Sequence, residues 1–245
     1  MDDAGFSLPE GGSLGGIVGE SGSGKSTLAR LVVALETATS GELTLRDVPP
    51  AAAGPQGSER KVLAKDVQIV FQDPYLSLDP RIPVGNAVAD VFRLHQKQGR
   101  KEAKDSARVL LGGRVGIGPE RFDARPRALS GGQRQRVALA KALAAAPPSP
   151  GAGRGHQRLD VSVQAQVLEL VEELRDQLGL TILFVTHDLA VVSRICSELL
   201  VMHQGRIVEQ GPTARILEDL GDDYTRNLIA SRPPRPLWDA EPVTA

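Results

Sequence analysis

The sequence has one cysteine, no long apolar run and almost no net charge, and each of these shortages excludes a class of protein. A single cysteine among 245 residues rules out a framework of disulfides within the chain and fits a reducing compartment. The longest apolar runs, such as Ile182 to Val185, are far shorter than the roughly 20 residues that a membrane-spanning helix needs. A net charge of −1 provides no basic field that would indicate nucleic acid as a partner.

Glycine and proline, in contrast, are abundant. The chain has 26 glycines and 17 prolines, where average composition predicts about 17 and about 12. Seven glycines lie between positions 11 and 24, and six glycines and prolines lie between 146 and 158. The first cluster indicates a backbone built for tight turns, and the second indicates a segment that cannot form a buried strand.

The first cluster contains a phosphate-binding loop pattern. GxxxxGK[ST] is matched by Gly19, Glu20, Ser21, Gly22, Ser23, Gly24, Lys25 and Ser26, with Thr27 following. Glycines let backbone N–H groups turn toward a phosphate, and the N-terminus of the next helix adds a positive field. In such a loop Lys25 reaches the β- and γ-phosphates, and the Ser26 hydroxyl holds Mg²⁺. Apolar residues before and after the loop predict a strand–loop–helix unit.

A second segment places backbone donors at the start of a helix. It reads Leu129, Ser130, Gly131, Gly132 and Gln133 and is followed by helix-forming residues. Ser130 is a good N-cap, and the two glycines expose backbone N–H groups where an anion binds favourably. Alone, this pattern is also that of an ordinary capped helix.

With both segments in this order, the sequence resembles the ATP-binding subunits of ABC transporters, from about Phe6 to Arg232. Gln72 and its neighbours resemble the glutamine loop of that family, Asp160 resembles the aspartate of its D-loop, and His187 resembles its switch histidine. Longer stretches are similar to the branch that imports oligopeptides, dipeptides and nickel; they cover residues 72–81, 159–166, 205–212 and 223–228.

The resemblance implies an α/β fold, a P-loop NTPase core of the ABC ATPase type with a helical subdomain. It implies a nucleotide-binding domain over residues 1–230, a helical subdomain at about 84–127 and a proline-rich tail at 231–245. Strand and helix patterns that alternate along the chain also favour an α/β fold. The expected strands are 14–18, 42–46, 67–71, 181–185, 198–202 and 206–209; the expected helices are 85–95, 101–111, 132–145 and 161–178; and 49–58 is expected to be a loop.

By resemblance, two such domains pair head to tail and enclose two ATP molecules. The phosphate loop of one domain then faces the Ser130 segment of the other. Gln72 and Ser26 contact Mg²⁺, and Gln72 also contacts the attacking water. His187 contacts the γ-phosphate and helps to stabilise the transition state. Asp160 belongs to the D-loop and also caps the helix that follows it.

The same resemblance implies the cofactors and partners. The cofactors are ATP and Mg²⁺. The protein partners are a second ABC ATPase subunit, identical or paralogous, two membrane permease subunits and, indirectly, an extracytoplasmic solute-binding protein; no nucleic acid is implied. The chain would then act at the cytoplasmic face of the bacterial plasma membrane and power the import of peptides or nickel, with the solute selected by other subunits.

One segment departs from the family pattern. Between the Ser130 segment and Asp160, the family has a buried aliphatic strand that ends in Asp-Glu; the Asp helps to hold Mg²⁺ and the Glu polarises the attacking water. Residues 146–158 instead contain three prolines, three glycines and no branched aliphatic side chain, a composition that excludes a central strand. Counted back from Asp160, the metal-ligand position is Gly153, and the general-base position is Arg154, which stays protonated.

Two explanations of this segment stay open, a genuine divergence and a compensated double frameshift. The frameshift fits the genetic code, because codons for Gly153 to Arg158 can read Asp-Glu-Ala-Ile-Ser one base later. Codons that cannot give Asp-Glu in that frame would exclude it.

Two other functions are alternatives to the active importer subunit. The first is a catalytically impaired or pseudogene-derived subunit that binds nucleotide without turnover. The second is a soluble ABC ATPase of DNA repair, which is disfavoured because that class carries long coiled-coil insertions, whereas Lys25 and Ser130 are only 105 positions apart. The chain also lacks the family's early strand with an adenine-stacking aromatic residue, so we expect a late start or a fragment.

Overall fold

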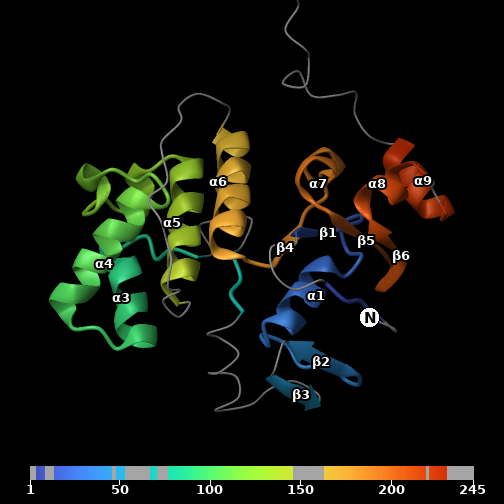
Figure 1. The fold of residues 1–245 in the computed structure, drawn as a ribbon, viewed down its shortest axis with the longest axis horizontal. Coiled ribbons are helices and arrows are strands. Elements are labelled where there is room, and N and C mark those ends of the chain that lie inside the picture. Colours follow the sequence, from blue (N-terminus) through green and yellow to red (C-terminus); the bar gives the residue numbers. More distant parts are fainter. Residues whose placement is uncertain are drawn as a thin grey trace, which may run out of the picture. The chain divides into compact units, whose positions relative to one another are not determined.

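The computed structural model describes residues 4–8, 14–45, 48–52, 67–70, 77–145, 163–218 and 221–230. The chain divides into two compact units, Met1–Ala29 with Leu174–Ala245, and Arg30–Glu173 (Figure 1). The proposed site residues Gln72, Gly153, Arg154 and Asp160 lie outside the described residues, as does the proline-rich tail.

The first unit contains a four-stranded sheet in the order β4-β1-β5-β6. Its strands are β1 (Leu14–Val18), β4 (Ile182–Val185), β5 (Glu198–His203) and β6 (Arg206–Pro212). Strand β1 is parallel to both β4 and β5, and β6 returns antiparallel to β5. These four strands were predicted from their branched aliphatic residues, and the prediction is confirmed to within a few residues at the ends. All five residues of β1 are buried, as expected for a central parallel strand.

Helices pack on this sheet and complete its core. They are α1 (Lys25–Val32), α7 (Leu189–Ile195), α8 (Thr213–Glu218) and α9 (Asp223–Ala230). On one side, Leu28 of α1 packs with Ile17, Leu200 and Met202. On α7, Val192 and the buried Cys196 beside it crowd Gly16, where an added Cβ would lie 2.6 Å from Val192 Cγ1 and 3.1 Å from Cys196 Sγ. Cys196 is therefore a packing residue.

The second unit contains a hairpin that corrects one prediction. Strand β2 (Glu42–Leu45) pairs antiparallel with β3 (Val48–Ala52), with Glu42 opposite Ala52. The sequence predicted a loop over residues 49–58. That prediction is wrong over 49–52, since proline is tolerated in an edge strand and β3 pairs only with β2 among the described strands.

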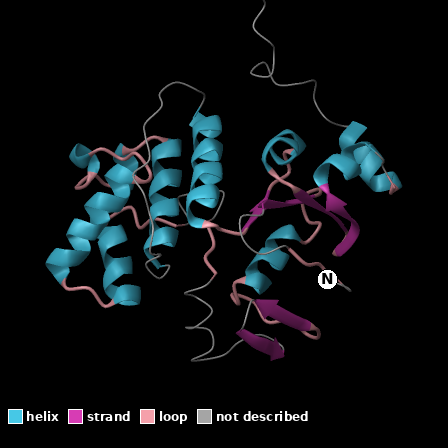
Figure 2. Cartoon of the chain, viewed as in Figure 1, coloured by secondary structure: helices cyan, strands magenta, loops and turns pink. Residues whose placement is uncertain are grey.

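Helices make up most of what the structure describes in the rest of the second unit (Figure 2). Its helices are α3 (Val84–Gln96), α4 (Arg100–Gly113), α5 (Gly131–Ala145) and the part of α6 (Val163–Leu178) that runs to Glu173, with 3₁₀ turns at Pro119–Arg121 and Pro126–Ala128. The four helices predicted from apolar spacing are confirmed over their described residues. The α3 and α5 helices are also joined by a hydrogen bond of 3.1 Å from Gln96 Nε2 to the carbonyl oxygen of Ala144. No described helix has the length and apolar content to cross a membrane.

A strand predicted at 67–71 is absent from its described part, residues 67–70, which have no regular secondary structure. Alternating apolar residues favour a strand, but a strand forms only where another segment supplies the hydrogen bonds of a ladder. Residues 67–70 join neither of the two sheets among the described residues.

Candidate functional site

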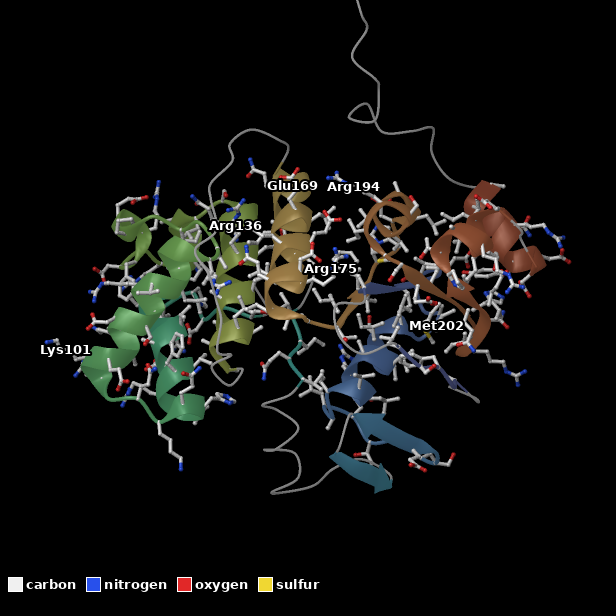
Figure 3. All side chains as sticks on the ribbon, in the orientation of Figure 1. Lys101, Arg136, Glu169, Arg175, Arg194 and Met202 are labelled. Atoms are coloured by element: carbon white, nitrogen blue, oxygen red, sulfur yellow. The ribbon has the colours of Figure 1, made fainter. Side chains whose placement is uncertain are left out.

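The phosphate loop joins the carboxyl end of β1 to the first turn of α1, as the sequence predicted. Three of its glycines have positive φ angles, 149° at Gly19, 83° at Gly22 and 103° at Gly24. L-residues with side chains rarely adopt these angles, so glycine allows the loop to curl around a phosphate. The first of them is also confined by the sheet, because a Cβ on Gly19 would lie 2.1 Å from the carbonyl oxygen of Met202, a residue labelled in Figure 3.

We expect Gly19→Ala to destabilise the protein by at least about 2 kcal/mol, because the added methyl group must displace either the loop or the backbone of β5. Chemical denaturation would measure the loss. Gly113→Ala is a matched control, since Gly113 is the last residue of α4, has no positive φ angle and has open space where the Cβ would lie. Equal denaturation midpoints for the two variants would contradict the confinement of Gly19.

Lys25 is folded back onto the loop. Its Nζ donates hydrogen bonds to the carbonyl oxygens of Gly19, at 2.7 Å, and of Glu20, at 2.6 Å, and to Ser23 Oγ at 3.3 Å. Burial lowers the pKa of the Lys25 ammonium, and the charge of Glu20 acts in the opposite direction. The exposed Ser26 occupies the first turn of α1. The loop thus presents a cation, a hydroxyl and a helix N-terminus at one place, the groups that bind a polyphosphate and its metal ion.

His187 lies at the same edge of the sheet as the loop. The backbone N–H of Thr186 donates to the carbonyl oxygen of Ile17 at 3.1 Å, which ties the end of β4 to the end of β1. Asp188 caps α7, because its Oδ1 accepts the backbone N–H of Ala190 at 2.8 Å. Between these two fixed neighbours, the side chain of His187 is exposed.

The Ser130 segment, in the second unit, forms a reciprocal N-terminal cap of α5. Ser130 Oγ accepts the N–H of Gln133 at 3.2 Å, and Gln133 Oε1 accepts the N–H of Ser130 at 3.0 Å. Such a capping box satisfies two donors of the first turn, and an N-cap of this kind contributes about 1 kcal/mol. Arg134 also holds Leu129, the residue before Ser130, by donating a hydrogen bond of 2.6 Å to its carbonyl oxygen. The described chain therefore holds Gly131 and Gly132 at a rigid helix start.

Sequence patterns missed three contacts of these segments. The hydroxyl of Tyr224 and the backbone N–H of Gly205 contact the phosphate loop. On the Ser130 helix, Lys141 Nζ donates to the carbonyl oxygen of Ser77 at 2.6 Å, and burial lowers the pKa of this lysine. No local periodicity could have revealed these contacts, because each joins residues at least 64 positions apart.

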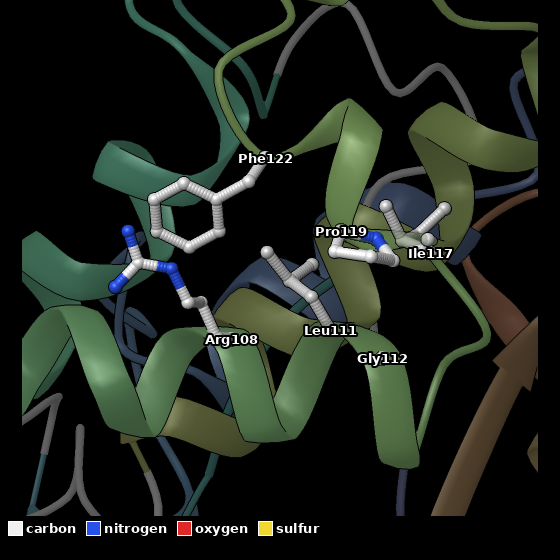
Figure 4. Close-up of a pocket in the computed structure, with 7 residues that line it drawn as sticks. Arg108, Leu111, Gly112, Ile117, Pro119 and Phe122 are labelled. Carbon is white, nitrogen blue, oxygen red and sulfur yellow. The ribbon is translucent and has the colours of Figure 1, made fainter.

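A cavity of about 180 Å³ lies within the second unit, against α4 (Figure 4). Its lining includes Leu111, Ile117 and Phe122, and the Arg108 guanidinium lies 4.5 Å from the centre of the Phe122 ring. The lining has no carboxylate, hydroxyl or thiol side chain. We therefore assign the cavity to helix packing and no reaction to it.

Comparison with known proteins places these features in a family. Residues 1–149 match the family described as ABC transporter. The chain is 39% identical over 233 residues to the di/tripeptide transport ATP-binding protein DppF of Pseudomonas aeruginosa, with 95% of this chain and 71% of the relative covered. It is 40% identical over 234 residues to the dipeptide transport ATP-binding protein DppF of Haemophilus influenzae, with 95% and 70% covered. It is also 40% identical over 217 residues to the glutathione import ATP-binding protein GsiA of Pectobacterium atrosepticum, with 89% of this chain but 34% of the relative covered.

Solved structures support the fold. CbiO1 from Clostridium perfringens, described as part of an ABC transporter complex, has a TM-score of 0.70 at 27% identity, with 88% of this chain and 83% of that chain covered. A dimeric ATP-binding cassette bound to ADP and Pi has a TM-score of 0.69 at 24% identity, with 86% and 89% covered. The predicted α/β P-loop fold is thereby confirmed.

Proposed function

Because the chain belongs to the ABC transporter family of ATP-binding proteins, we propose that it is the ATP-hydrolysing subunit of a bacterial importer of small peptides. The observation that carries the proposal is the phosphate loop at the carboxyl edge of a parallel sheet, with Lys25 folded onto it and His187 at the same edge. The relatives named for dipeptide, di/tripeptide and glutathione transport support a peptide rather than nickel as the solute.

In this proposal, the backbone N–H groups of the loop bind the phosphates of ATP. Lys25 exchanges its bonds to loop carbonyl oxygens for bonds to the β- and γ-phosphates. The Ser26 hydroxyl and Gln72 hold Mg²⁺, which supplies charge neutralisation at the phosphates. His187 donates a hydrogen bond to the γ-phosphate, and Asp160 is the aspartate of the D-loop. The fit to a polyphosphate rests on the loop glycines with positive φ angles and on Lys25 and the exposed Ser26 in the first turn of α1.

A second ATPase subunit completes the site in this proposal. Its Ser130 segment would approach the phosphate loop of the first subunit, because a helix start rich in backbone donors binds an anion. Two permease subunits and a solute-binding protein are the other proposed partners, which places the chain at the cytoplasmic face of the plasma membrane.

The test is transport in membrane vesicles that contain the chain together with the permeases of its own locus. We expect uptake of a radiolabelled dipeptide that requires ATP, is competed by unlabelled dipeptide and stops when the chain is omitted. ATP-dependent uptake of radiolabelled nickel without uptake of the dipeptide would assign the importer to a metal instead. A chain that is not recovered with the permeases would overturn the proposal of an importer subunit.

A second candidate function is a subunit that binds ATP with little turnover. It is favoured by one observation, the occurrence of Gly153 and Arg154 where the family has the Asp and Glu that hold Mg²⁺ and polarise water. Such a subunit could still close the dimer around ATP. ATP turnover measured on the chain as written distinguishes the two candidates.

A further inference from the structure

A tyrosine close to the C-terminal end of the described chain contacts the phosphate loop. Tyr224, in the first turn of α9, accepts the backbone N–H of Glu20 on its hydroxyl oxygen at 2.9 Å, across 204 positions of sequence. Burial raises the pKa of the Tyr224 phenol, so the hydroxyl is protonated at neutral pH while its oxygen accepts this bond. The backbone N–H of Glu20, in the phosphate loop, is thus bound by the side chain of Tyr224, although α9 has no phosphate-binding sequence pattern.

The tyrosine ring is itself held by the sheet. It stacks on the imidazole of His203, with ring centres 3.9 Å apart and planes inclined by 29°. His203 begins the two-residue turn between β5 and β6, where Gln204 and Gly205 have positive φ angles of 47° and 81°. This pair of angles is typical of a tight hairpin turn whose geometry is closely defined. The ring therefore rests on a rigid support.

The same turn makes a second contact with the loop. The backbone N–H of Gly205 donates to the carbonyl oxygen of Ser23 at 2.9 Å. The segment before α9 is in turn attached to β6, because Glu209 Oε1 accepts the N–H of Gly221 at 3.1 Å. Asp222 Oδ1 accepts the N–H of Tyr224 at 2.8 Å and so holds the first turn of α9. Thus α9 holds Glu20 of the loop, and the β5–β6 turn holds Ser23.

We propose that Tyr224 is a positioning residue for nucleotide binding, which fixes the first half of the phosphate loop through Glu20. The inference rests on the proposed role of the loop as the ATP site. A loop that is already ordered before the nucleotide arrives loses less conformational entropy when it binds. Since the hydroxyl makes one neutral hydrogen bond at an exposed site, its removal is expected to weaken ATP binding about 3- to 10-fold.

The experiment compares the full chain with Tyr224→Phe, which removes the hydroxyl and keeps the ring. Binding of ATP carrying a fluorescent mant group gives the dissociation constant, and NMR gives the exchange rate of the Glu20 amide in the nucleotide-free protein. We expect a 3- to 10-fold higher dissociation constant, faster exchange at Glu20 and an unchanged melting temperature. His203→Ala, which keeps the hydroxyl and removes its support, is expected to weaken binding by an intermediate factor.

Asn227→Ala is the matched control, because Asn227 is an exposed residue of the same helix, and it is expected to bind like the original chain. If the original chain binds mant-ATP and Tyr224→Phe binds equally well, the positioning role is overturned while the ATP site stands. A loss of affinity accompanied by a lower melting temperature and unchanged exchange at Glu20 also overturns it. If the original chain binds no mant-ATP, the proposed function fails, and this inference fails with it.

Discussion

Replacing residues 146–157 with a strand that ends in Asp-Glu is expected to raise ATP turnover at least about 100-fold, the lower range for a positioned acid or base. The replacement is Arg-Pro-Lys-Leu-Leu-Val-Leu-Asp-Glu-Ala-Ile-Ser, which follows the shifted reading frame apart from a free choice of lysine at its third position. It puts a carboxylate in place of Gly153 to hold Mg²⁺ and another in place of Arg154 to polarise water. The present arginine stays protonated, so it cannot accept a proton.

A matched variant separates the strand from its acidic pair. It carries the same replacement with Asn-Gln instead of Asp-Glu, and we expect it to gain stability but no turnover. A steady-state phosphate-release assay on the original chain and both variants makes the comparison. If the chain as written hydrolyses ATP as fast as the Asp-Glu variant, Arg154 does not occupy the general-base position.

The structure supplies a reason to expect the gain in stability. Strand β4 is Ile-Leu-Phe-Val, yet all four of its residues are only partly buried, and among the described strands it pairs with β1 alone. Parallel strands of this composition are normally covered on both sides. A restored aliphatic strand would have an apolar edge with which to pair, and each aliphatic side chain that becomes buried contributes about 1.5–3 kcal/mol.

Lys25→Ala is expected to weaken ATP binding by about 30-fold or more, a loss of about 2 kcal/mol, because charge-assisted bonds to the phosphates disappear. Measurement of mant-ATP binding tests this independently of turnover, so it applies even if the chain hydrolyses ATP slowly. The loop itself also loses three hydrogen bonds made by Lys25 Nζ. Circular dichroism must therefore show that the variant is folded.

Lys101→Ala is the control for charge. Lys101 is an exposed lysine of α4 (Figure 3), and its removal changes the net charge by the same amount. We expect its dissociation constant for mant-ATP to equal that of the original chain. If the two lysine variants bind equally well, Lys25 does not contact the phosphates.

Local sequence predicted the elements whose chemistry is local. The spacing from Gly19 to Ser26 describes one continuous loop and helix start, so each residue carries its role in its immediate context. The Ser130–Gln133 cap is likewise complete within four residues. The strand at 14–18 could be predicted because its five residues, Leu-Gly-Gly-Ile-Val, include no polar side chain, and all five are buried.

The sequence-based predictions were wrong where strand formation depends on pairing with a second segment of the chain. Pro49 to Ala52 form a strand because β2 pairs with them, and residues 67–70 form none among the described residues because neither sheet includes them. Alternating apolar residues indicate only a preference for extended backbone. A strand also needs a second segment to pair with its backbone N–H and C=O groups, and the local sequence does not identify that segment.

The sequence by itself therefore determined the family and the phosphate loop, since each depends on residue identity at fixed spacing. That Arg154 occupies the general-base position stays a prediction. Only the tertiary structure decided that Gly19 is confined by Met202, that His187 shares an edge with the loop, and that Tyr224 contacts Glu20. These contacts join segments up to 204 positions apart. The packing of the sheet and its helices brings them together, and no local pattern encodes that packing.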